Sequence, residues 1–371
     1  MLLNNIFLYV EDNDTVEIKP STVAVALSGG VDSSLAAALL KKSGWDVTGL
    51  HFILSSTGPK KRAKRKMVRR IAEFLHIPVK FIDLEAEFDR NVVAAFMDAY
   101  LTGMTPNPCV TCNQVIKFHH LRGYADKNGI EYIATGHYAN IKNRDKDIVE
   151  LWRGNDKKKD QSYFLHRLKR TCFSKILFPL GSLTKVEVRR IATEMGIPAS
   201  SEPESQEICF IPGNDYRAFM EIKKGCGIIN KGNIVDVNGN IVGEHLGTYR
   251  FTTGQRHGLG IASTGPYYVM SLRPDKNEIV VGRKDDLFSS LVYVDSFNSL
   301  TAKPPQRPVK VMAQVRYRHR PAPCLLEILS PDRVRVCFDE PQWAITPGQA
   351  LVCYEDGHVL GGGWIMEKIP E

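Results

Sequence analysis

The sequence predicts an α/β protein in which an N-terminal doubly wound parallel sheet precedes a small, mostly-β middle domain and a C-terminal β-barrel. Strand-like apolar runs alternate with helical patterns in the first third of the chain, which is typical of a parallel sheet. From about residue 213, glycine becomes frequent and short alternating runs lie between turn signals. From about residue 289 the runs become longer and more regular, as in a small barrel. We therefore expect domains at residues 1–212, 213–288 and 289–371.

Composition and charge indicate a soluble globular protein with a polyanionic partner. The 371 residues are 43% hydrophobic and 24% charged, and the formal net charge is +8. No stretch approaches about 18 apolar residues, so we expect no membrane span. Residues 1–14 have no basic segment ahead of their short apolar run, which is not the pattern of a secretory signal. Eight cysteines are too few for a disulfide framework in a chain of this length, and we expect a cytoplasmic protein.

The first predicted strand leads into an anion site. The apolar run Thr22–Leu27 ends at Ser28–Gly30, and a helical pattern follows from near Asp32 to Lys42, with Gly44 as its C-cap. A strand, a tight turn and a helix N-terminus direct backbone N–H groups and the helix dipole at a phosphate. The run is neither a Walker A loop nor the GxGxxG of a dinucleotide fold. We interpret it as another kind of nucleotide loop rather than a plain glycine turn.

Later segments extend the sheet and add loops at its edge. Further strands are predicted at Trp45–Phe52, Val79–Leu84 and Glu131–Thr135. Helices are predicted at Glu85–Leu101 and Asn113–Tyr124, a loop at Cys109–Asn113, and helices with polar loops over residues 150–212. In a doubly wound sheet the loops after the strands share one edge. We therefore expect residues 28–34, 51–52, 107–113 and 136–138 to converge on one crevice.

A dense basic run follows the second predicted strand. Residues 60–70 hold eight Lys or Arg side chains and no acidic one. The run leads into a helix whose apolar face is expected to contain Met67, Ile71, Phe74 and Leu75. Such a run is either a solvated helix flank or a surface that attracts a nucleic-acid backbone, and its place beside the nucleotide loop favours the second interpretation.

The second half of the chain carries β-strand patterns. Ile234–Val237 and Ile241–Val242 flank the turn signal Asn238-Gly239, which predicts a hairpin. Barrel strands are predicted at residues 291–296, 309–318, 325–330, 333–338 and 350–355. Alternation along 309–318 places the odd-numbered apolar residues on one face, so we expect an outward basic stripe of Arg316, Arg318 and Arg320.

Three cysteines are candidates for chemistry. Cys109 and Cys112 form a CxxC pair near the expected crevice, and Cys209 follows a polar turn. Taken alone, a CxxC pair is a zinc half-site, a redox pair or a structural feature, and no second pair completes a zinc tetrad. Cys112 precedes a predicted helix, whose dipole would favour its thiolate. Cys226 remains undecided, and small buried hydrophobic positions are expected for Cys172, Cys324, Cys337 and Cys353.

Nine strings resemble one family over nearly the whole chain. The loop at 28–34 is similar to the Ser-Gly-Gly-x-Asp-Ser loop of ATP pyrophosphatases, and the full set resembles the bacterial tRNA-specific 2-thiouridylases, which form 2-thiouridine at the wobble position. The strings are SGGVDSS (28–34), TPNPCVTCN (105–113), IKFHHL (116–121), TGHYA (135–139), KDQSYFL (159–165), SQEICFI (205–211), GQRHGLGI (254–261), VRYRH (315–319) and DEPQWAITPGQ (339–349).

The resemblance implies a Rossmann-like ATP-pyrophosphatase domain, a tRNA-binding barrel and an activation step. Uracil O2 would attack the α-phosphate of ATP, with Mg²⁺ neutralising charge, and pyrophosphate would leave. The implied ATP-binding residues are Ala26, Leu27, Ser28, Gly29, Gly30, Val31, Asp32, Ser33, Phe52 and Gly136. The implied contacts with the target base and tRNA are Asn107, Pro108, Cys109, Lys159, Asp160, Gln161, Arg316 and Tyr317.

The resemblance also implies the sulfur chemistry of a tRNA-uridine 2-sulfurtransferase. A persulfide on Cys209 would attack C2 of the adenylated base, which leaves the anticodon stack to be modified. Cys112 would be the nucleophile that releases the sulfur, leaving a Cys112–Cys209 disulfide, and AMP would depart. A sulfur-donor protein, either a cysteine desulfurase or a relay, would load the enzyme. The expected acceptors are the tRNAs for Lys, Glu and Gln.

One position departs from the family pattern. Cys109 stands where most members have the Asp that is their proposed general acid/base, so that role is unassigned here unless the thiol shuttles the proton. Three thiolates, at Cys109, Cys112 and Cys209, can instead hold a [4Fe–4S] cluster with one open iron. The persulfide and the cluster are therefore two alternative sulfur routes.

Two functions from other classes compete with tRNA thiolation. An ATP-pyrophosphatase synthetase that adenylates a small molecule would need neither the CxxC pair nor Cys209, nor a basic barrel. A non-catalytic RNA-binding protein would not need an intact nucleotide loop together with Cys112 and Cys209. The presence of the nucleotide loop, the CxxC pair and Cys209 in one chain favours tRNA thiolation.

Overall fold

The protein divides into two compact units. The computed structural model describes residues 21–54, 59–145, 148–202, 208–262 and 264–366. The first unit comprises Met1–Phe88, Cys112–Glu204 and Gly357–Val359, and the second comprises Asp89–Thr111, Ser205–Asp356 and Leu360–Glu371. The N-terminal segment 1–14, the Ser205–Glu207 turn, and the side chains of Lys60, Lys61 and Cys226 lie outside the described residues.

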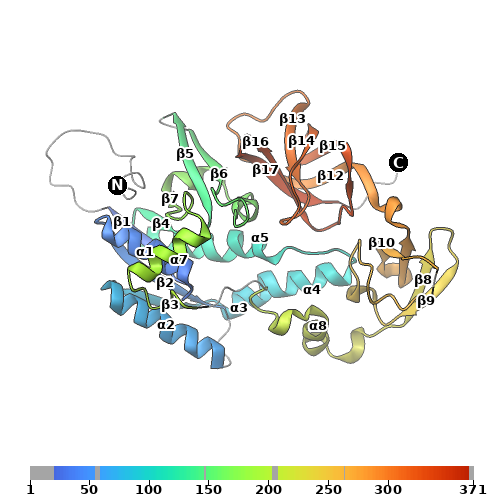
Figure 1. Ribbon diagram of the computed structural model, residues 1–371, viewed down its shortest axis with the longest axis horizontal. Coiled ribbons are helices and arrows are strands. Elements are labelled where there is room, and N and C mark those ends of the chain that lie inside the picture. Colours follow the sequence, from blue (N-terminus) through green and yellow to red (C-terminus); the bar gives the residue numbers. More distant parts are fainter. Residues whose placement is uncertain (1–20, 55–58, 146–147, 203–207, 263, 367–371) are drawn as a thin grey trace. The chain divides into compact units, whose positions relative to one another are not determined.

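The first unit is built on a five-stranded parallel sheet (Figure 1). Its strands, in spatial order, are β3 (Val79–Asp83), β2 (Asp46–Ile53), β1 (Thr22–Ala26), β4 (Tyr132–Ala134) and β7 (Ile176–Leu177). β1 pairs in parallel with β2 on one side and with β4 on the other. This arrangement confirms the doubly wound sheet, and the strand order reverses between β1 and β4, which is where such folds bind ligands.

Helices cover the sheet through apolar faces. α1 (Val31–Lys42), α2 (Pro59–Leu75) and α7 (Lys185–Glu194) contribute to one buried cluster, and α6 (His119–Lys127) contacts β1 and β4. Among the side chains of α2 that the structure describes, Val68 and Ile71 are fully buried, whereas Phe74 is 42% exposed, so the expected apolar face was wrong at that position. α1 ends with Ser43 as its C-cap, and Gly44 follows in the left-handed conformation at φ 85°.

The segment after β4 is not mainly helical as expected. β5 (Ala139–Asp145) and β6 (Ile148–Arg153) form an antiparallel hairpin, which pairs at Trp152 with His358 of the same unit. Two 3₁₀ helices, η3 (Ser162–Leu165) and η4 (Arg170–Lys175), follow before β7 and α7. The sequence Ile-Val-Glu-Leu-Trp is rich in β-formers, and this composition outweighed the helical pattern in the part of 150–212 next to the turn.

Short helical pieces replace two other expectations. The expected helix 85–101 is α3 (Glu85–Phe88), the π-helical turn η1 (Asp89–Val93) and α4 (Ala94–Leu101). The expected loop over Cys109–Asn113 is wrong, because α5 (Pro108–Cys112) and the π-helical η2 (Asn113–Phe118) occupy it. Pro108 has no N–H to lose and a fixed φ, which suits the first position of a helix.

A four-stranded sheet forms the middle of the second unit. Its order is β10 (Tyr268–Arg273), β11 (Glu278–Gly282), β8 (Gly232–Asp236) and β9 (Ile241–His245). The predicted hairpin is confirmed, with Gly239 at φ 86° in the β8–β9 turn. Helix α8 (Tyr216–Lys224) precedes this sheet, and the short 3₁₀ helices are Pro212–Asn214, Cys226–Ile228, Thr248–Arg250, Pro274–Lys276 and Lys284–Leu287.

A six-stranded antiparallel barrel completes the second unit. The order is β12 (Phe288–Ser299), β15 (Arg333–Trp343), β14 (Ala322–Ser330), β13 (Val309–Gln314), β16 (Ala350–Glu355) and β17 (His358–Ile365), and β12 closes it onto β17. The barrel is confirmed, although β17 was not expected. β13 ends at Gln314, so Arg316, Arg318 and Arg320 lie on the following turn and not on a strand face. No helix in the described ranges is long and apolar enough to cross a membrane.

Candidate functional site

The predicted nucleotide loop lies at the carboxyl edge of the parallel sheet. Ser28–Gly30 follow β1, Phe52 is at the end of β2, and Gly136 follows β4. Because β2 and β4 flank β1, these three segments meet at one edge (Figure 1). Residues 107–109 belong to the other unit.

Serine hydroxyls and glycine fix the shape of the loop. The Ser33 hydroxyl accepts from the Ser28 N–H at 3.1 Å and donates to the Gly30 carbonyl at 3.2 Å. Ser34 Oγ donates to the same carbonyl at 2.8 Å. Gly29 has φ 82°, a conformation that favours glycine. Gly30 is the N-cap of α1 and has no capping side chain, so the N-terminus of α1 presents backbone N–H groups suited to a phosphate.

The acidic residue of the loop is paired with a lysine. Lys185 Nζ lies 2.6 and 2.7 Å from the two Asp32 carboxylate oxygens, and the Tyr138 hydroxyl donates to Asp32 Oδ1 at 2.7 Å. Lys185 is 8% exposed and opens α7, where Thr184 and Glu187 form a capping box. Sequence reasoning missed Lys185. The capping box marked a helix start, but nothing in it pointed to Asp32.

The basic helix α2 packs against the loop. A Cβ on Gly29 would meet Val68 Cγ2 at 3.2 Å and Lys64 Cγ at 3.3 Å. His51 Nδ1 donates to the Leu27 carbonyl at 2.7 Å. Burial lowers the pKa of His51, and the Lys64 and Arg65 charges lower it further against the effect of that hydrogen bond. His51 is therefore uncharged at neutral pH and holds the Leu27 carbonyl before the loop. The positive electrostatic field at the loop comes from the Lys and Arg side chains of α2.

Gly136 supports the loop from β4. A Cβ at this position would meet the Asp32 carbonyl carbon and the Ser33 nitrogen, both at 2.7 Å. The next residue, His137, bonds through Nδ1 to Thr135 Oγ1 at 2.7 Å. Desolvation, with the Lys117 charge, lowers the pKa of His137 to about 3. The turn after β4 thus places uncharged groups and bare backbone against the start of α1.

Replacing Gly136 with alanine should destabilise the protein by about 1–3 kcal/mol, because the added methyl overlaps backbone that cannot rotate away. ATP affinity should fall with it, since Asp32 and Ser33 would shift. Urea unfolding and ATP titration measure the two effects. Gly123→Ala in α6 is the matched control, because nothing lies within 4 Å of its added Cβ. Equal unfolding midpoints for the two variants would contradict the expected clash.

The predicted tRNA segment 159–161 lies in the connection between β6 and η3. Asp160 is buried at 5% exposure; it pairs with Arg153 at 2.7 Å and accepts from the Gly154 and Ser162 N–H groups at 2.9 and 3.0 Å. Gln161 Oε1 accepts from the Tyr138 N–H at 3.1 Å. The geometry thus gives Asp160 and Gln161 structural contacts, while Lys159 is partly exposed.

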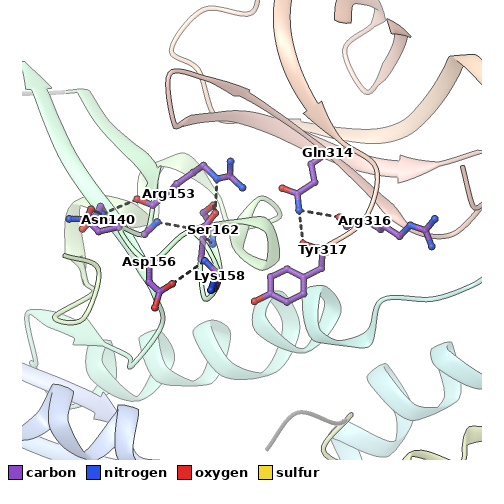
Figure 2. A network of polar contacts seen from close by, with 11 residues as sticks. Asn140, Arg153, Asp156, Lys158, Ser162, Gln314, Arg316 and Tyr317 are labelled. Carbon is purple, nitrogen blue, oxygen red and sulfur yellow. Dashed lines mark hydrogen bonds and ion pairs between the residues drawn. The ribbon is translucent and has the colours of Figure 1, made fainter. Parts of the chain in front are cut away.

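The same turn is linked to the nucleotide loop. Asp156 Oδ1 accepts from the Lys158 N–H at 3.0 Å (Figure 2). Asp156 Oδ2 accepts from the Lys185 N–H at 2.9 Å. Lys185 in turn holds Asp32. Lys185 therefore contacts both Asp156 of the Lys-rich turn and Asp32, which follows the loop after β1.

The three candidate cysteines differ in exposure and belong to different units. Cys112 is buried in the first unit, whereas Cys109 and Cys209 are exposed in the second. Cys112 directly precedes the expected helical run, which is formed by η2 and α6. It is also the last residue of α5 and has helical dihedral angles, so the expectation that it stands at a helix N-terminus is wrong. Across the described ranges, no group of three or more His, Cys, Asp or Glu side chains is placed to hold a metal ion.

The segment that precedes Cys109 is held by the barrel within the second unit. Gln349 Nε2 donates to the Thr105 carbonyl at 2.9 Å and to the Pro106 carbonyl at 3.3 Å. The Thr105 N–H donates to the Pro347 carbonyl at 2.9 Å. Asn107 and Pro108 are buried. The string at 339–349 therefore includes a clamp on the TPNP segment, which sequence reasoning did not identify.

Aromatic packing fixes the backbone beside Cys209. The Phe210 ring makes edge-to-face contacts with Phe96 and Phe219, with centroids at 5.3 and 5.6 Å. Cys209 is exposed next to this anchored residue. The Cys209 thiol is therefore accessible from solvent.

The barrel residues Arg316 and Tyr317 lie on the turn after β13. The buried Gln314 donates through Nε2 to the carbonyls of Arg316 at 3.1 Å and Tyr317 at 2.6 Å (Figure 2). The Arg316 guanidinium lies 5.4 Å from the Trp343 ring centroid. Both side chains are partly exposed, so the turn presents a cation and an aromatic ring on a rigid backbone.

The prediction of buried positions is confirmed for some of the four cysteines that it covers and wrong for others. Cys324 and Cys353 are buried in the barrel, and burial raises the pKa of the Cys324 thiol to about 12. Cys172 is partly buried. Cys337 is exposed, which contradicts the expectation, because its side chain falls on the outer face of β15.

Known proteins resemble this chain along nearly its whole length. The family described as "tRNA methyl transferase HUP domain" matches residues 21–213, "tRNA methyl transferase PRC-barrel domain" residues 224–283, and "Aminomethyltransferase beta-barrel domain" residues 289–365. The tRNA-specific 2-thiouridylase MnmA of Syntrophotalea carbinolica is 44% identical over 94% of this chain and 99% of its own. That of Geobacter metallireducens is 42% identical over 94% and 98%.

Solved structures are more distant. A 4-thiouridine synthetase–RNA complex with bound ATP aligns with a TM-score of 0.36 at 15% identity, covering 55% of this chain and 50% of that one, which is too low to support an inference. The family assignment rests instead on the full-length relatives and the HUP-domain match. The chain belongs to the tRNA-specific 2-thiouridylase family.

Proposed function

We propose that this protein is an ATP-dependent tRNA sulfurtransferase that forms 2-thiouridine at the wobble position, residue 34. The observation that carries the proposal is an intact Ser28–Ser34 loop at the carboxyl edge of the sheet in a chain 44% identical to a tRNA-specific 2-thiouridylase over 94% of its length. We retain the division into domains 1–212, 213–288 and 289–371 as part of this proposal, with the barrel as a tRNA-binding domain.

The first step is activation of the base. Residues 26–33, with Phe52 and Gly136, would hold ATP so that uracil O2 attacks its α-phosphate and pyrophosphate leaves. The N-terminus of α1 and the cations of α2 favour the phosphates. Asp32 is the carboxylate beside the loop and is already paired with Lys185, so a Mg²⁺ ion would depend mainly on ATP phosphate oxygens and water and would neutralise charge there.

The second step is sulfur transfer from Cys209. The outer sulfur of a Cys209 persulfide would bond to C2, and the Cys112 thiolate would then attack Cys209 Sγ. The sulfur–sulfur bond of the persulfide breaks, the new disulfide joins Cys112 to Cys209, and AMP leaves C2 as the thiocarbonyl forms. A dithiol reductant must return both cysteines to thiols. The exposure of Cys209 supports its loading by a donor protein, a cysteine desulfurase or a relay.

A [4Fe–4S] cluster on Cys109, Cys112 and Cys209 is the alternative sulfur route. Within the described part of the chain, no group of three or more His, Cys, Asp or Glu side chains is placed to hold a metal ion, and we assign no step to the cluster. Anaerobic purification separates the routes. Full activity without iron and without absorbance near 400 nm supports the persulfide route, whereas activity that tracks bound iron supports the cluster.

The purified protein, given ATP, a cysteine desulfurase that carries labelled persulfide sulfur, and a transcript of a tRNA for Lys, Glu or Gln, should place labelled sulfur in the nucleoside of residue 34. Nucleoside mass spectrometry identifies the product and separates thiolation from the methyl transfer that the domain descriptions name. The same transcript with cytidine at residue 34 is the matched control. Sulfur-free uridine in the wild-type reaction, or ATP-independent labelling, would contradict the proposal.

A further inference from the structure

The GQRHGLGI string surrounds a hollow on the middle domain that the proposed reaction does not use. The hollow has a volume of about 480 Å³ and is lined by residues 256–261 and 264–267. All of it lies within the second unit, between η7 (Thr248–Arg250) and β10. None of the lining residues is acidic.

The backbone around the hollow is fixed. Gln255 Oε1 accepts from the Thr252 N–H at 3.2 Å, and Gln255 Nε2 donates to the His257 carbonyl at 2.8 Å. The Gly254 N–H donates to the Val269 carbonyl at 2.8 Å. Leu259, at 7% exposure, anchors the loop in the core of the middle sheet. The loop is therefore fixed by these hydrogen bonds and by the buried Leu259, while Arg256 and His257 remain exposed.

Two glycines keep the surface of the loop bare. Gly258 and Gly260 have φ of 76° and 67°, where a larger residue would be strained. Nothing lies within 4 Å of a Cβ on Gly260, so packing does not explain the absence of a side chain there. Left-handed glycines expose successive backbone groups to whatever enters, which is a common arrangement for binding anions.

A second arginine lies at the rim. The Arg283 guanidinium is 4.3 Å from the Tyr267 ring centroid, and its Nη1 donates to the Pro266 carbonyl at 3.2 Å. A Cβ on Gly265 would lie 3.1 Å from the same Nη1. Arg256 and Arg283 thus give the hollow two cations, one of them held in place over an aromatic ring.

We propose that this hollow binds a phosphodiester group of the tRNA substrate, with Arg256 and the loop backbone as its main contacts. Small-molecule sites enclose most of their ligand. Here Arg256, His257, Gly258, Gly260, Thr264 and Pro266 are all exposed, which suits a chain lying across the surface better than an enclosed metabolite. The inference rests on the proposed function, because it takes tRNA as the ligand.

The test is the salt dependence of tRNA binding by the full-length protein. Arg256→Ala should make the slope of log Kobs against log [KCl] shallower by about 1, because one phosphate contact is lost. Arg256→Lys should restore most of the slope. Lys276→Ala is the matched control, an exposed cation of the same domain outside the hollow, and it should leave the slope unchanged.

The thiolation assay separates this proposal from the preceding one. Arg256→Ala should raise KM for tRNA and leave kcat at saturating tRNA unchanged. A wild-type protein that binds tRNA through Arg256 but makes no 2-thiouridine supports the RNA site and contradicts the proposed function. An unchanged salt-dependence slope for tRNA binding in Arg256→Ala overturns the RNA site. This holds even if the wild-type protein binds inorganic phosphate, added at constant ionic strength, through Arg256, because the hollow would then be a phosphate site and not an RNA site.

Discussion

Replacing Cys209 with serine should lower 2-thiouridine formation from a persulfide donor by on the order of a thousandfold or more, because a hydroxyl oxygen cannot carry the transferable sulfur. Cys112→Ser should have a similar effect, since the sulfur would not be released from Cys209. Both variants should still activate the base, because neither cysteine belongs to the loop after β1. Nucleoside mass spectrometry measures the first effect, and tRNA-dependent exchange of labelled pyrophosphate into ATP measures the second.

Cys337→Ser is the matched control, because Cys337 is also exposed in the second unit but lies on the outer barrel face. It should retain full activity. The double variant of Cys112 and Cys209 should be no worse than either single one, because the two thiols act in one sequence of steps. Thiolation that survives in Cys209→Ser would remove the persulfide assignment. Loss of activity in Cys109→Asp, with iron in the wild type, would favour the cluster.

The sheet and the nucleotide loop could be predicted because their signals are local. The apolar run before Ser28 and the helical pattern after Asp32 define β1, the turn and α1 within about 20 residues. The strand order then brings Phe52 and Gly136 to the same edge, as the general topology of doubly wound sheets requires. Short-range pattern and a topological rule were sufficient here.

Contacts between distant segments could not be predicted in this way. Lys185 reaches Asp32 across 153 positions, and Gln349 reaches Thr105 across 244. A lysine at a helix start and a glutamine after a turn are common features with no pattern that names their partners. The motif strings marked both regions, but their side-chain partners follow from tertiary structure alone.

β17 escaped prediction because its sequence contains Gly361–Gly363, which reads as a strand breaker. In the structure, the backbone of β12 lies so close to Gly361 and Gly363 that no side chain fits there. A Cβ on Gly361 would meet the Asn298 carbonyl oxygen at 2.5 Å, and one on Gly363 would meet the Asp295 carbonyl oxygen at 2.5 Å. Closure of the barrel between β12 and β17 therefore requires glycine at these positions, and glycine is the residue that weakens the strand pattern in the sequence.

Replacing Lys185 with methionine should weaken ATP binding and slow base activation by about tenfold to a hundredfold, because Asp32 loses its charge-assisted hydrogen bonds beside the phosphate site. The unpaired carboxylate would repel the phosphates that the N-terminus of α1 attracts. The effect should stay in this range because the Asp32 side chain is 32% exposed, so water screens part of its charge. ATP titration and pyrophosphate exchange measure both quantities.

Lys185→Arg keeps the cation and should recover much of the loss, and Lys41→Met, at an exposed position in the last turn of α1, should change neither quantity. The decisive comparison is Asp32→Asn combined with Lys185→Met. If the lysine acts by neutralising Asp32, the double variant should bind ATP better than Lys185→Met, because the uncompensated charge is gone. If instead Lys185 contacts the phosphates directly, removing the Asp32 charge will restore nothing, and the role assigned to the ion pair would be wrong.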